Sequence, residues 1–372
     1  MELINKKNLK DLKDLVQNKI YKKVLVIGGN KSFYKSKANT LISRLTQDKE
    51  VSFFLKKKSI PMLSELIILI NKIKKYKPNL IIAIGGGTVM DLSKISNAMH
   101  DIENIKYKIE NSRYKIKKNF CDIIAIPMTA GSGAEVTTNA VIYIDKKKYS
   151  IEGELIKPNH MALFPELVIN NKRKDIICSS AFDCFAQAVE SMFSTKSNKQ
   201  SIEFSQKAIT IFNNNYKTYI KNKSYEKGYL LSLASYYSGK AISISKTIAP
   251  HAVSYPFTSY FNVNHGHAVS LTFDSFLQFG FENLSNQTAK YNLKDRYHLL
   301  FKVLKISTLE ELLLKIKDIK KDLSLETKLS KINKKIPSNL DLIINNVNTQ
   351  RLANSPVNIE KQDIYNIIKK IV

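Results

Sequence analysis

Three of the six histidines in this 372-residue chain fall within 17 residues, at His251, His265 and His267. Upstream, Asp183 and Gln187 stand four residues apart in an apolar segment that reads as a helix, so both project from one face. A carboxylate combined with imidazoles is a ligand set for zinc or ferrous iron. The spacing alone is not specific, because histidines satisfied by hydrogen bonds inside a core would fit the same pattern.

Two turns rich in glycine and hydroxyl side chains each follow a run of β-branched residues. Residues 85–94 (GGGTVMDLSK) lie where a strand turns into a helix, and glycine there would let the backbone approach a pyrophosphate beside free helix N–H groups. Residues 127–138 (PMTAGSGAEVTT) follow another strand, and such turns line one crevice in an open α/β sheet. Together they could hold one nucleotide. Neither matches a Rossmann GxGxxG or a P-loop, so each also fits a turn without a ligand.

The elements that position these residues change in type near residue 170. Continuous apolar runs are typical of parallel strands buried on both faces. They span residues 24–27, 80–84 and 123–126. Apolar spacing near 3.6 predicts helices further on. These helices span 203–220, 226–245, 295–305 and 309–318. We therefore predict a parallel α/β domain over residues 1–170 and an all-α domain over 171–372. Without a linker rich in Pro, Gly or Ser, we expect them to abut and share a cleft.

Composition narrows the class of protein. Hydrophobic residues make up 44% and charged residues 24%, which is ordinary for a globular chain. The three cysteines, Cys121, Cys178 and Cys184, form no CxxC pair, so we expect reduced thiols rather than a zinc ribbon or a disulfide framework. No stretch has the length and apolarity of a membrane span, and residues 1–7 lack a signal-peptide pattern. We expect a cytoplasmic protein without a membrane partner.

The net charge of +27 comes from 59 Lys and Arg against 32 Asp and Glu. Only five of the 59 are Arg, and the lysines are spread along the chain without a basic tail. Nucleic-acid readers rely on Arg forks, stacking aromatics or a groove-binding motif, which this sequence does not show. Codon bias explains the lysines more simply. We expect no specific nucleic-acid partner, and a small anionic substrate suits the charge.

Five segments, in this order, resemble the iron-containing (group III) alcohol dehydrogenase family, which includes relatives of glycerol dehydrogenase and dehydroquinate synthase. They are GGGTVMDLSK, PMTAGSGAEVTT, AFDCFAQAVES at 181–191, His251, and HGHA at 265–268. The resemblance implies the dehydroquinate synthase-like fold, in which the first domain is Rossmann-like and binds the nucleotide, and the second binds metal and substrate. NADPH or NADH and a divalent metal, Fe²⁺ or Zn²⁺, would meet between the two domains.

The resemblance also implies roles for individual residues. The cofactor set is Asn30, Ser32, Gly86, Gly87, Thr88, Asp91, Thr129, Thr138 and Lys148. Among these, Gly86, Gly87 and Asp91 would meet the pyrophosphate region, and Thr129, Thr138 and Lys148 the nicotinamide and its ribose. The metal set is Asp183, Gln187, His251 and His265.

This chain departs from the family around the metal. Gln187 stands where the family has a histidine ligand, so it is either a weaker oxygen ligand or only a neighbour of the ligands. Tyr255 replaces a further histidine of many members, while His267 follows His265 by two residues. We expect proton delivery by His267 or by water.

Two further departures lie in the first domain. The acidic residue that selects NAD is absent from the turn at 28–32, and Lys31 stands there instead. NADPH is therefore favoured over NADH. Phe164 replaces an Asp before Pro165, and we expect it only to pack.

A metal with an open position would polarise an aldehyde oxygen for hydride addition. Four segments look most like the branch of the family that reduces phosphonoacetaldehyde to 2-hydroxyethylphosphonate. They span 148–154, 181–187, 246–256 and 265–267. Lys246 and His267 would then face the phosphonate. The alternatives are a general short-chain alcohol or aldehyde dehydrogenase, and a lyase resembling dehydroquinate synthase. The sequence is compatible with a homodimer and does not decide the oligomeric state.

Overall fold

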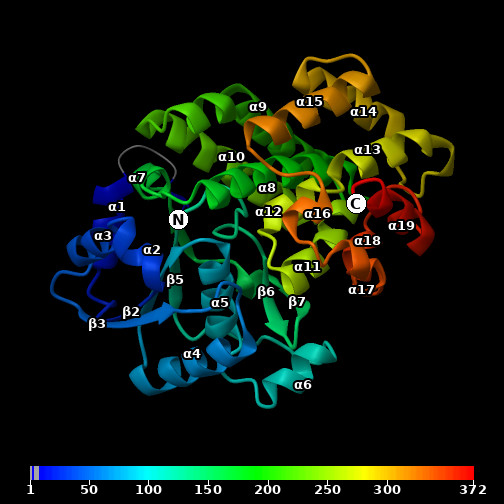
Figure 1. Ribbon diagram of the computed structural model, residues 1–372. Helices are drawn as coiled ribbons and strands as arrows, with labels where there is room; N and C mark the ends of the chain where they lie inside the picture. The colour runs from blue at the N-terminus through cyan, green and yellow to red at the C-terminus, as the bar shows by residue number, and fades with distance from the viewer. Residues whose placement is uncertain (1, 4–7) are drawn as a thin grey trace. The chain divides into compact units, whose positions relative to one another are not determined.

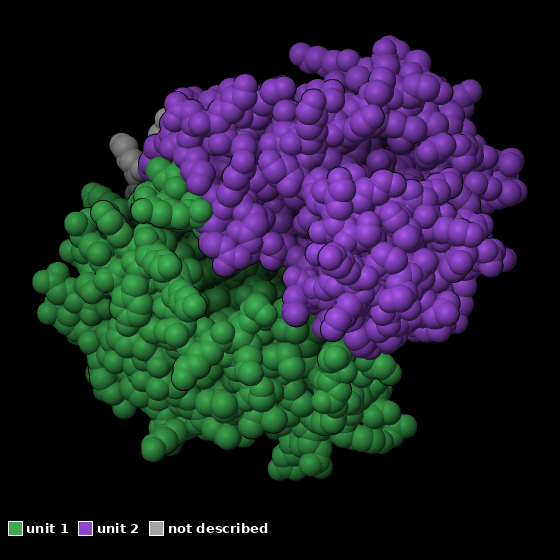
Figure 2. Space-filling model, in the orientation of Figure 1, with its two compact units in different colours: residues 1–129, 133–172 green, residues 130–132, 173–372 purple. Residues whose placement is uncertain are grey.

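The computed structural model describes residues 2–3 and 8–372. Residues 1 and 4–7 lie outside the described residues. They belong to the N-terminal segment in which the sequence analysis found no signal-peptide pattern. The chain divides into two compact units (Figure 2): residues 1–129 with 133–172 form unit 1, and 130–132 with 173–372 form unit 2. The sequence analysis placed the boundary between residues 170 and 171. The exchange of 130–132 between the units was not expected.

Unit 1 is built on a parallel sheet of six described strands, in the order β1-β8-β5-β4-β2-β3. Figure 1 labels β2, β3 and β5 of this sheet. The strands are β1 (Glu2–Leu3), β2 (Lys23–Gly29), β3 (Glu50–Lys56), β4 (Leu80–Gly85), β5 (Asp122–Pro127) and β8 (His160–Ala162). The three apolar runs read from the sequence are β2, β4 and β5. Leu80–Gly85 is buried along its whole length, as a central strand covered on both faces must be. The predicted α/β class is confirmed.

Helices cover both faces of this sheet. They are α1 (Asn8–Val16), α2 (Asn30–Lys35), α3 (Ala38–Leu45), α4 (Leu63–Tyr76), α5 (Gly87–Ala98) and α7 (Pro165–Ile169). Helix α6 (Ile105–Glu110) instead contacts β7 (Lys147–Glu152), outside this sheet. One core joins α1, α2, α3 and α7 to the sheet, with Val26, Ile82 and Ile124 facing it. Phe164 is buried in the same core and packs there. Because α5 packs on the strands as well, the central strands meet no solvent on either face.

Unit 1 also contains an antiparallel pair that the sequence analysis did not predict. It consists of β6 (Asn139–Ile144) and β7 (Lys147–Glu152), followed by the 3₁₀ turn η1 (Glu154–Ile156). The two-residue loop, Asp145 and Lys146, has φ of 48° and 68°, as a tight hairpin turn requires. The usual sequence for this turn contains glycine, and its absence here explains why the hairpin was missed.

Unit 2 is entirely helical over its described elements, as predicted. The helices are α8 (Lys174–Phe193), α9 (Lys199–Lys221), α10 (Tyr225–Ser245), α11 (Ala249–Phe261), α12 (His265–Ser270), α13 (Phe273–Glu282), η2 (Leu284–Asn286), α14 (Leu293–Leu304), α15 (Leu309–Asp322), α16 (Leu329–Ile332), η3 (Pro337–Asn339), α17 (Leu340–Asn345), α18 (Thr349–Leu352) and α19 (Lys361–Lys369). The four helices expected from periodicity are α9, α10, α14 and α15. None of the described helices is long and apolar enough to cross a membrane.

Helix α8 is the centre of unit 2. It packs against α9, α10, α12 and α14, and every residue from Ala181 to Phe193 is buried. A helix buried on all sides is normally apolar all round. Polar side chains on α8 therefore need partners inside the unit, and two of them, Asp183 and Glu190, belong to the site described next.

Candidate functional site

The carboxyl ends of three adjacent strands form one edge of the sheet in unit 1. Strand β2 pairs with β3 on one side and β4 on the other, and the chain then continues from β4 to its neighbour β5. The order of strands therefore reverses between β2 and β4. In open α/β sheets such a switch point is where nucleotides bind, beyond the carboxyl ends of the strands. The predicted cofactor residues follow these strands.

The turn after β4 has the features of a phosphate-binding turn. Gly86 is the N-cap of α5 and Gly87 its first residue, so the free N–H groups of this 12-residue helix begin here. A Cβ on Gly86 would lie 3.5 Å from the Thr129 side chain, which follows the neighbouring strand β5. The structure thus brings Gly86 and Thr129 together, while Thr88 lies in the first turn of α5. The N-terminus of α5, whose free N–H groups no side chain caps, fits a diphosphate.

Asp91 and Lys148 also come together, from α5 and β7. Burial raises the pKa of Asp91 to about 6, although Lys94 and Lys148 oppose the shift and the Val141 N–H donates to the carboxylate. Tyr143 pairs with Lys148 across the hairpin. Lys148 of the hairpin therefore lies beside Asp91, the only acidic residue of α5.

The remaining cofactor candidates sit at the ends of β2 and β6. Asn30 opens α2 directly after β2, and the Ser32 hydroxyl donates to the Gly29 carbonyl at 3.3 Å. Both residues are exposed, as is Lys31 between them. Thr138 directly precedes β6, and its carbonyl accepts from the Gly153 N–H at 2.9 Å.

Lys94 stabilises the second of the two glycine-rich turns, residues 127–138. The sequence analysis did not single it out. Its side chain is buried, and its ammonium donates to the carbonyls of Ala134, Thr137 and Asn139 and to the Thr137 hydroxyl, all within 2.9 Å. A buried ammonium needs such a set of acceptors. Its position three residues after Asp91 was visible, but acceptors at least 40 residues away were not.

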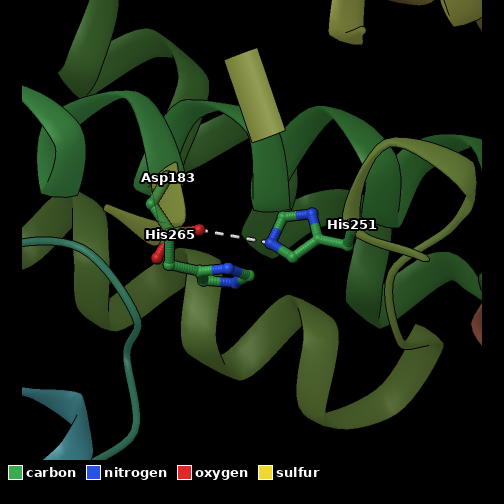
Figure 3. Close-up of side chains that lie close together, drawn as sticks. All are labelled: Asp183, His251 and His265. Carbon is green, nitrogen blue, oxygen red and sulfur yellow. Dashed lines mark hydrogen bonds and ion pairs between the residues drawn. The ribbon is translucent and has the colours of Figure 1, made fainter. Parts of the chain in front are cut away.

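In unit 2, Asp183, His251 and His265 form one cluster (Figure 3). They come from α8, α11 and α12, and one ligand atom of each lies within 4.8 Å of the others. Asp183 Oδ1 is 3.2 Å from His251 Nε2, and the two imidazole rings are 5.2 Å apart at an angle of 76°. One carboxylate oxygen and two imidazole nitrogens are ligands that zinc and ferrous iron accept, with positions left for water or substrate. The donor set fits a divalent metal.

Electrostatics favours a cation at this position. Burial alone would lower the pKa of His251, but the carboxylates of Glu190 and Asp183 outweigh it and raise the value to about 10. Burial raises the pKa of Glu190, against the opposing charge of His251. The two carboxylates thus stabilise positive charge here, which the protonated imidazole supplies in the metal-free protein and which a divalent metal would supply when bound.

Both histidines have a partner on Nδ1. His251 Nδ1 is 2.5 Å from Glu190 Oε1, and His265 Nδ1 is 3.5 Å from the hydroxyl of Ser254, which itself donates to the His251 carbonyl. Glu190 is completely buried. The sequence analysis missed it, although it stands seven residues after Asp183 on the same face of α8, and this spacing was the available signal.

Helix α12 approaches α8 unusually closely at Gly266. A Cβ there would lie 1.9 Å from the Ser179 carbonyl oxygen and 2.8 Å from Asp183 Cβ. The next residue, His267, donates its backbone N–H to the Ser179 hydroxyl at 3.0 Å. Only glycine permits this approach, which brings His265 to Asp183.

Gln187, His267 and Tyr255 were the other residues expected near the metal. Gln187 is buried one turn after Asp183, and its Oε1 is 3.4 Å from the Ser238 hydroxyl, which has a shorter bond to the Ser235 carbonyl. His267 is not part of the three-residue cluster; its Nε2 donates to the Glu326 carbonyl at 2.7 Å, and burial lowers its pKa. The Tyr255 ring lies 5.9 Å from that of His265.

A parallel α/β unit with a bare helix end at its switch point, and a helical unit with a carboxylate and two oriented imidazoles, define a protein equipped for a nucleotide cofactor and a metal. The chain belongs to the iron-containing alcohol dehydrogenase family. The family model for iron-containing alcohol dehydrogenase matches residues 3–171, and the model for the C-terminal part of the family matches residues 177–372.

Individual relatives are distant. A phosphonoacetaldehyde reductase of Streptomyces viridochromogenes is 28% identical over 57% of this chain and 55% of its own length. A 4-hydroxybutyrate dehydrogenase of Clostridium kluyveri is 28% identical over 62% of this chain and 61% of its own. The matched stretches thus span little more than half of these relatives.

Solved structures agree in fold over the whole chain. Sulfoacetaldehyde reductase from Bifidobacterium kashiwanohense, in complex with NAD⁺, has a TM-score of 0.87 at 22% identity and covers 100% of this chain and 96% of its own. An alcohol dehydrogenase from Oenococcus oeni has a TM-score of 0.89 at 18% identity, with 100% and 98% covered.

Proposed function

We propose that this chain is a metal-dependent, NAD(P)H-linked alcohol dehydrogenase that works as an aldehyde reductase. The observation that carries the proposal is the cluster of Asp183, His251 and His265 within 4.8 Å, inside a chain that belongs to the iron-containing alcohol dehydrogenase family. A metal bound there supplies a Lewis acid for a carbonyl oxygen, and a bound nicotinamide supplies hydride.

The chain's own residues bind and orient these groups. Asp183, His251 and His265 hold the metal, and Gln187 is either a fourth ligand or a neighbour of the ligands. Both Fe²⁺ and Zn²⁺ accept the donor set. The segments after β2, β4 and β5, together with Lys148 of β7, bind the cofactor. The set comprises Asn30, Ser32, Gly86, Gly87, Thr88, Asp91, Thr129, Thr138 and Lys148.

NADPH is the cofactor we favour. The exposed start of α2, residues 30–32, carries Lys31 and no carboxylate that would bond a ribose 2′-hydroxyl or repel a 2′-phosphate. His267 is our candidate for the proton relay to the product oxygen. Its Nε2 proton is held by the Glu326 carbonyl, so Nδ1 is the nitrogen that can exchange a proton with water or substrate.

For the substrate we propose a short aldehyde with an anionic group, with phosphonoacetaldehyde as the best candidate. The names of the phosphonoacetaldehyde reductase and the 4-hydroxybutyrate dehydrogenase both describe short compounds that carry an anion. Lys246, five residues before His251, and His267 would face this anion. Lys246 has φ 65° and ψ 176°, a backbone region that is costly for any residue except glycine and occurs mainly at functional sites.

The test compares NADPH with NADH oxidation for phosphonoacetaldehyde, succinate semialdehyde and propanal, each with Fe²⁺ or Zn²⁺. The proposal expects metal-dependent oxidation of NADPH with preference for the anionic aldehydes. His265→Ala should lose both metal and turnover, whereas His267→Ala should keep its metal and lose rate. Equal rates for all three aldehydes would leave a general short-chain dehydrogenase. Turnover in His265→Ala close to that of the unaltered protein would overturn the metal assignment.

The proposal also covers partners. We propose a small anionic substrate and no specific nucleic-acid or membrane partner; weak retention on heparin at moderate salt would agree with this, and a steep salt dependence would not. A homodimer is the assembly to test by light scattering.

A further inference from the structure

Glu190 is a carboxylate with no exposed surface, and both of its oxygens accept hydrogen bonds. Oε1 accepts from His251 Nδ1 at 2.5 Å, and Oε2 accepts from the Ile248 backbone N–H at 2.8 Å. One donor is the side chain of a metal-ligand candidate, whose backbone N–H also bonds the carboxylate, and the other is the N-cap residue of the helix that carries it. A charged group is rarely buried completely unless its partners require it.

We propose that Glu190 is a positioning residue that prepares His251 for metal binding, by keeping the imidazole proton on Nδ1 so that the Nε2 lone pair faces the metal position beside Asp183. This inference rests on the proposed function, because it concerns the same metal site. It adds a residue that neither holds the metal nor touches substrate.

The reason lies in the two nitrogens of imidazole. A neutral ring has one proton, so only one nitrogen can donate a lone pair to a metal. His251 Nε2 faces Asp183 at 3.2 Å, on the side of the metal position, so a metal bound there would take the Nε2 lone pair and leave the ring proton on Nδ1. A carboxylate 2.5 Å away holds it there more strongly than any neutral acceptor would. In metal sites, such outer partners commonly change affinity 10- to 100-fold.

A second role of Glu190 can be separated from the first. Its bond to Ile248 tethers the turn between α10 and α11, but other bonds tether the same turn. The Ser245 hydroxyl donates to Ser191 Oγ at 2.7 Å, and the Ser194 hydroxyl donates to the Ser245 carbonyl at 2.5 Å. Ser191 is therefore a matched control: it is buried, adjacent to Glu190 on α8, and its hydroxyl accepts from Ser245 of the turn.

Glu190→Gln isolates the choice of tautomer because it preserves shape. The amide has one carbonyl oxygen, and the Ile248 N–H is an obligate donor that must have it. The amide NH₂ then faces His251 Nδ1, which has to become an acceptor, so the ring proton moves to Nε2 and points at the metal position. The opposite orientation of the amide would bury two donors against each other.

The experiment measures Zn²⁺ affinity by chelator competition, and the visible spectrum of the Co²⁺-loaded protein, for the unaltered chain, Glu190→Gln and Ser191→Ala. Thermal unfolding of the metal-free proteins verifies folding. We expect a 10- to 100-fold loss of Zn²⁺ affinity and an altered Co²⁺ spectrum in Glu190→Gln, and a change of about twofold or less in Ser191→Ala. In a His251→Ala background, adding Glu190→Gln should have no further effect, since Glu190 acts through His251.

The inference is wrong if Glu190→Gln binds Zn²⁺ as tightly as the unaltered chain, if Ser191→Ala loses as much, or if the two changes are additive in the double variant. If Glu190→Gln does not fold, Glu190→Asp replaces it: a shorter carboxylate cannot reach both donors, and unchanged affinity would equally refute the role. An unaltered chain that binds no Zn²⁺ or Co²⁺ would instead refute the proposed function.

Discussion

Replacing Gly266 by alanine tests whether close contact between α12 and α8 creates the metal site. Gly266 directly follows His265, and its missing Cβ would lie 1.9 Å from the Ser179 carbonyl oxygen. A carbon and a carbonyl oxygen stay at least about 3.3 Å apart. The distance must therefore grow by about 1.4 Å. Because the obstacle is backbone of a buried helix, no side chain can rotate to relieve the clash.

Two effects of known size follow. Overpacking of a core costs about 1–3 kcal/mol in the free energy of unfolding, and a backbone obstacle places this variant at the upper end. A shift of about 1.4 Å also exceeds the tolerance of metal–ligand distances, which is about 0.2 Å. We expect Gly266→Ala to lower metal affinity at least as far as the loss of an outer partner does, by about 100-fold or more.

The assay combines chemical denaturation with metal content after dialysis against a weak chelator. Gly280→Ala serves as the control, since its Cβ would meet the Tyr297 hydroxyl at 2.7 Å, in a helix that carries none of the clustered ligands. It should lose stability and keep its metal. If Gly266→Ala retained metal as well as Gly280→Ala does, the close approach at Gly266 would not be what brings His265 to Asp183.

Three further substitutions test unit 1 and the exchanged segment. Lys94→Met leaves the acceptors of its ammonium unpaired, so it should lower the free energy of unfolding by about 3 kcal/mol and raise the KM for NADPH; unchanged values for both would refute the role of Lys94. Burial raises the pKa of Glu135 to about 7. The protonated side chain therefore contributes to the stability of the fold at low pH, and this stability is lost as the pH rises through 7. Glu135→Gln should therefore be more stable than the unaltered chain above about pH 7, by about 3 kcal/mol, with the difference vanishing below about pH 4.5; parallel melting-temperature profiles would contradict this. Gly131→Ala places a Cβ 2.9 Å from the Ser180 carbonyl, and calorimetry should show a loss of about 1–3 kcal/mol, whereas no loss would show that the segment yields freely.

The central strands and long helices were predictable because one physical signal dominates each. Strands β2, β4 and β5 are buried on both faces, and this leaves uninterrupted apolar runs in the sequence. Helix α9 keeps an apolar periodicity over many turns. The hairpin of β6 and β7 was not predictable, since Asp145 and Lys146 adopt positive φ without the glycine that announces such a turn.

The residues of the site also fall into those that were predictable from the sequence and those that were not. Asp183 and the histidines were identified by residue type and family pattern, which is local information. The role of Glu190 depends on His251, 61 residues further along the chain, and the role of Lys94 depends on a turn 40 residues away or more. Only the packing of helices brings these groups together. The need for glycine at position 266 likewise cannot be recognised in the sequence, because it arises from the close contact of α12 with α8.

The most direct test of the central claim follows NADPH oxidation with phosphonoacetaldehyde by one preparation in three states: as purified, after removal of metal by a chelator, and after addition of Fe²⁺ or Zn²⁺. A metal centre formed by Asp183, His251 and His265 predicts turnover that disappears on chelation and returns with one equivalent of metal per chain. Turnover that survives complete removal of metal would contradict the claim, as would the absence of turnover in every state.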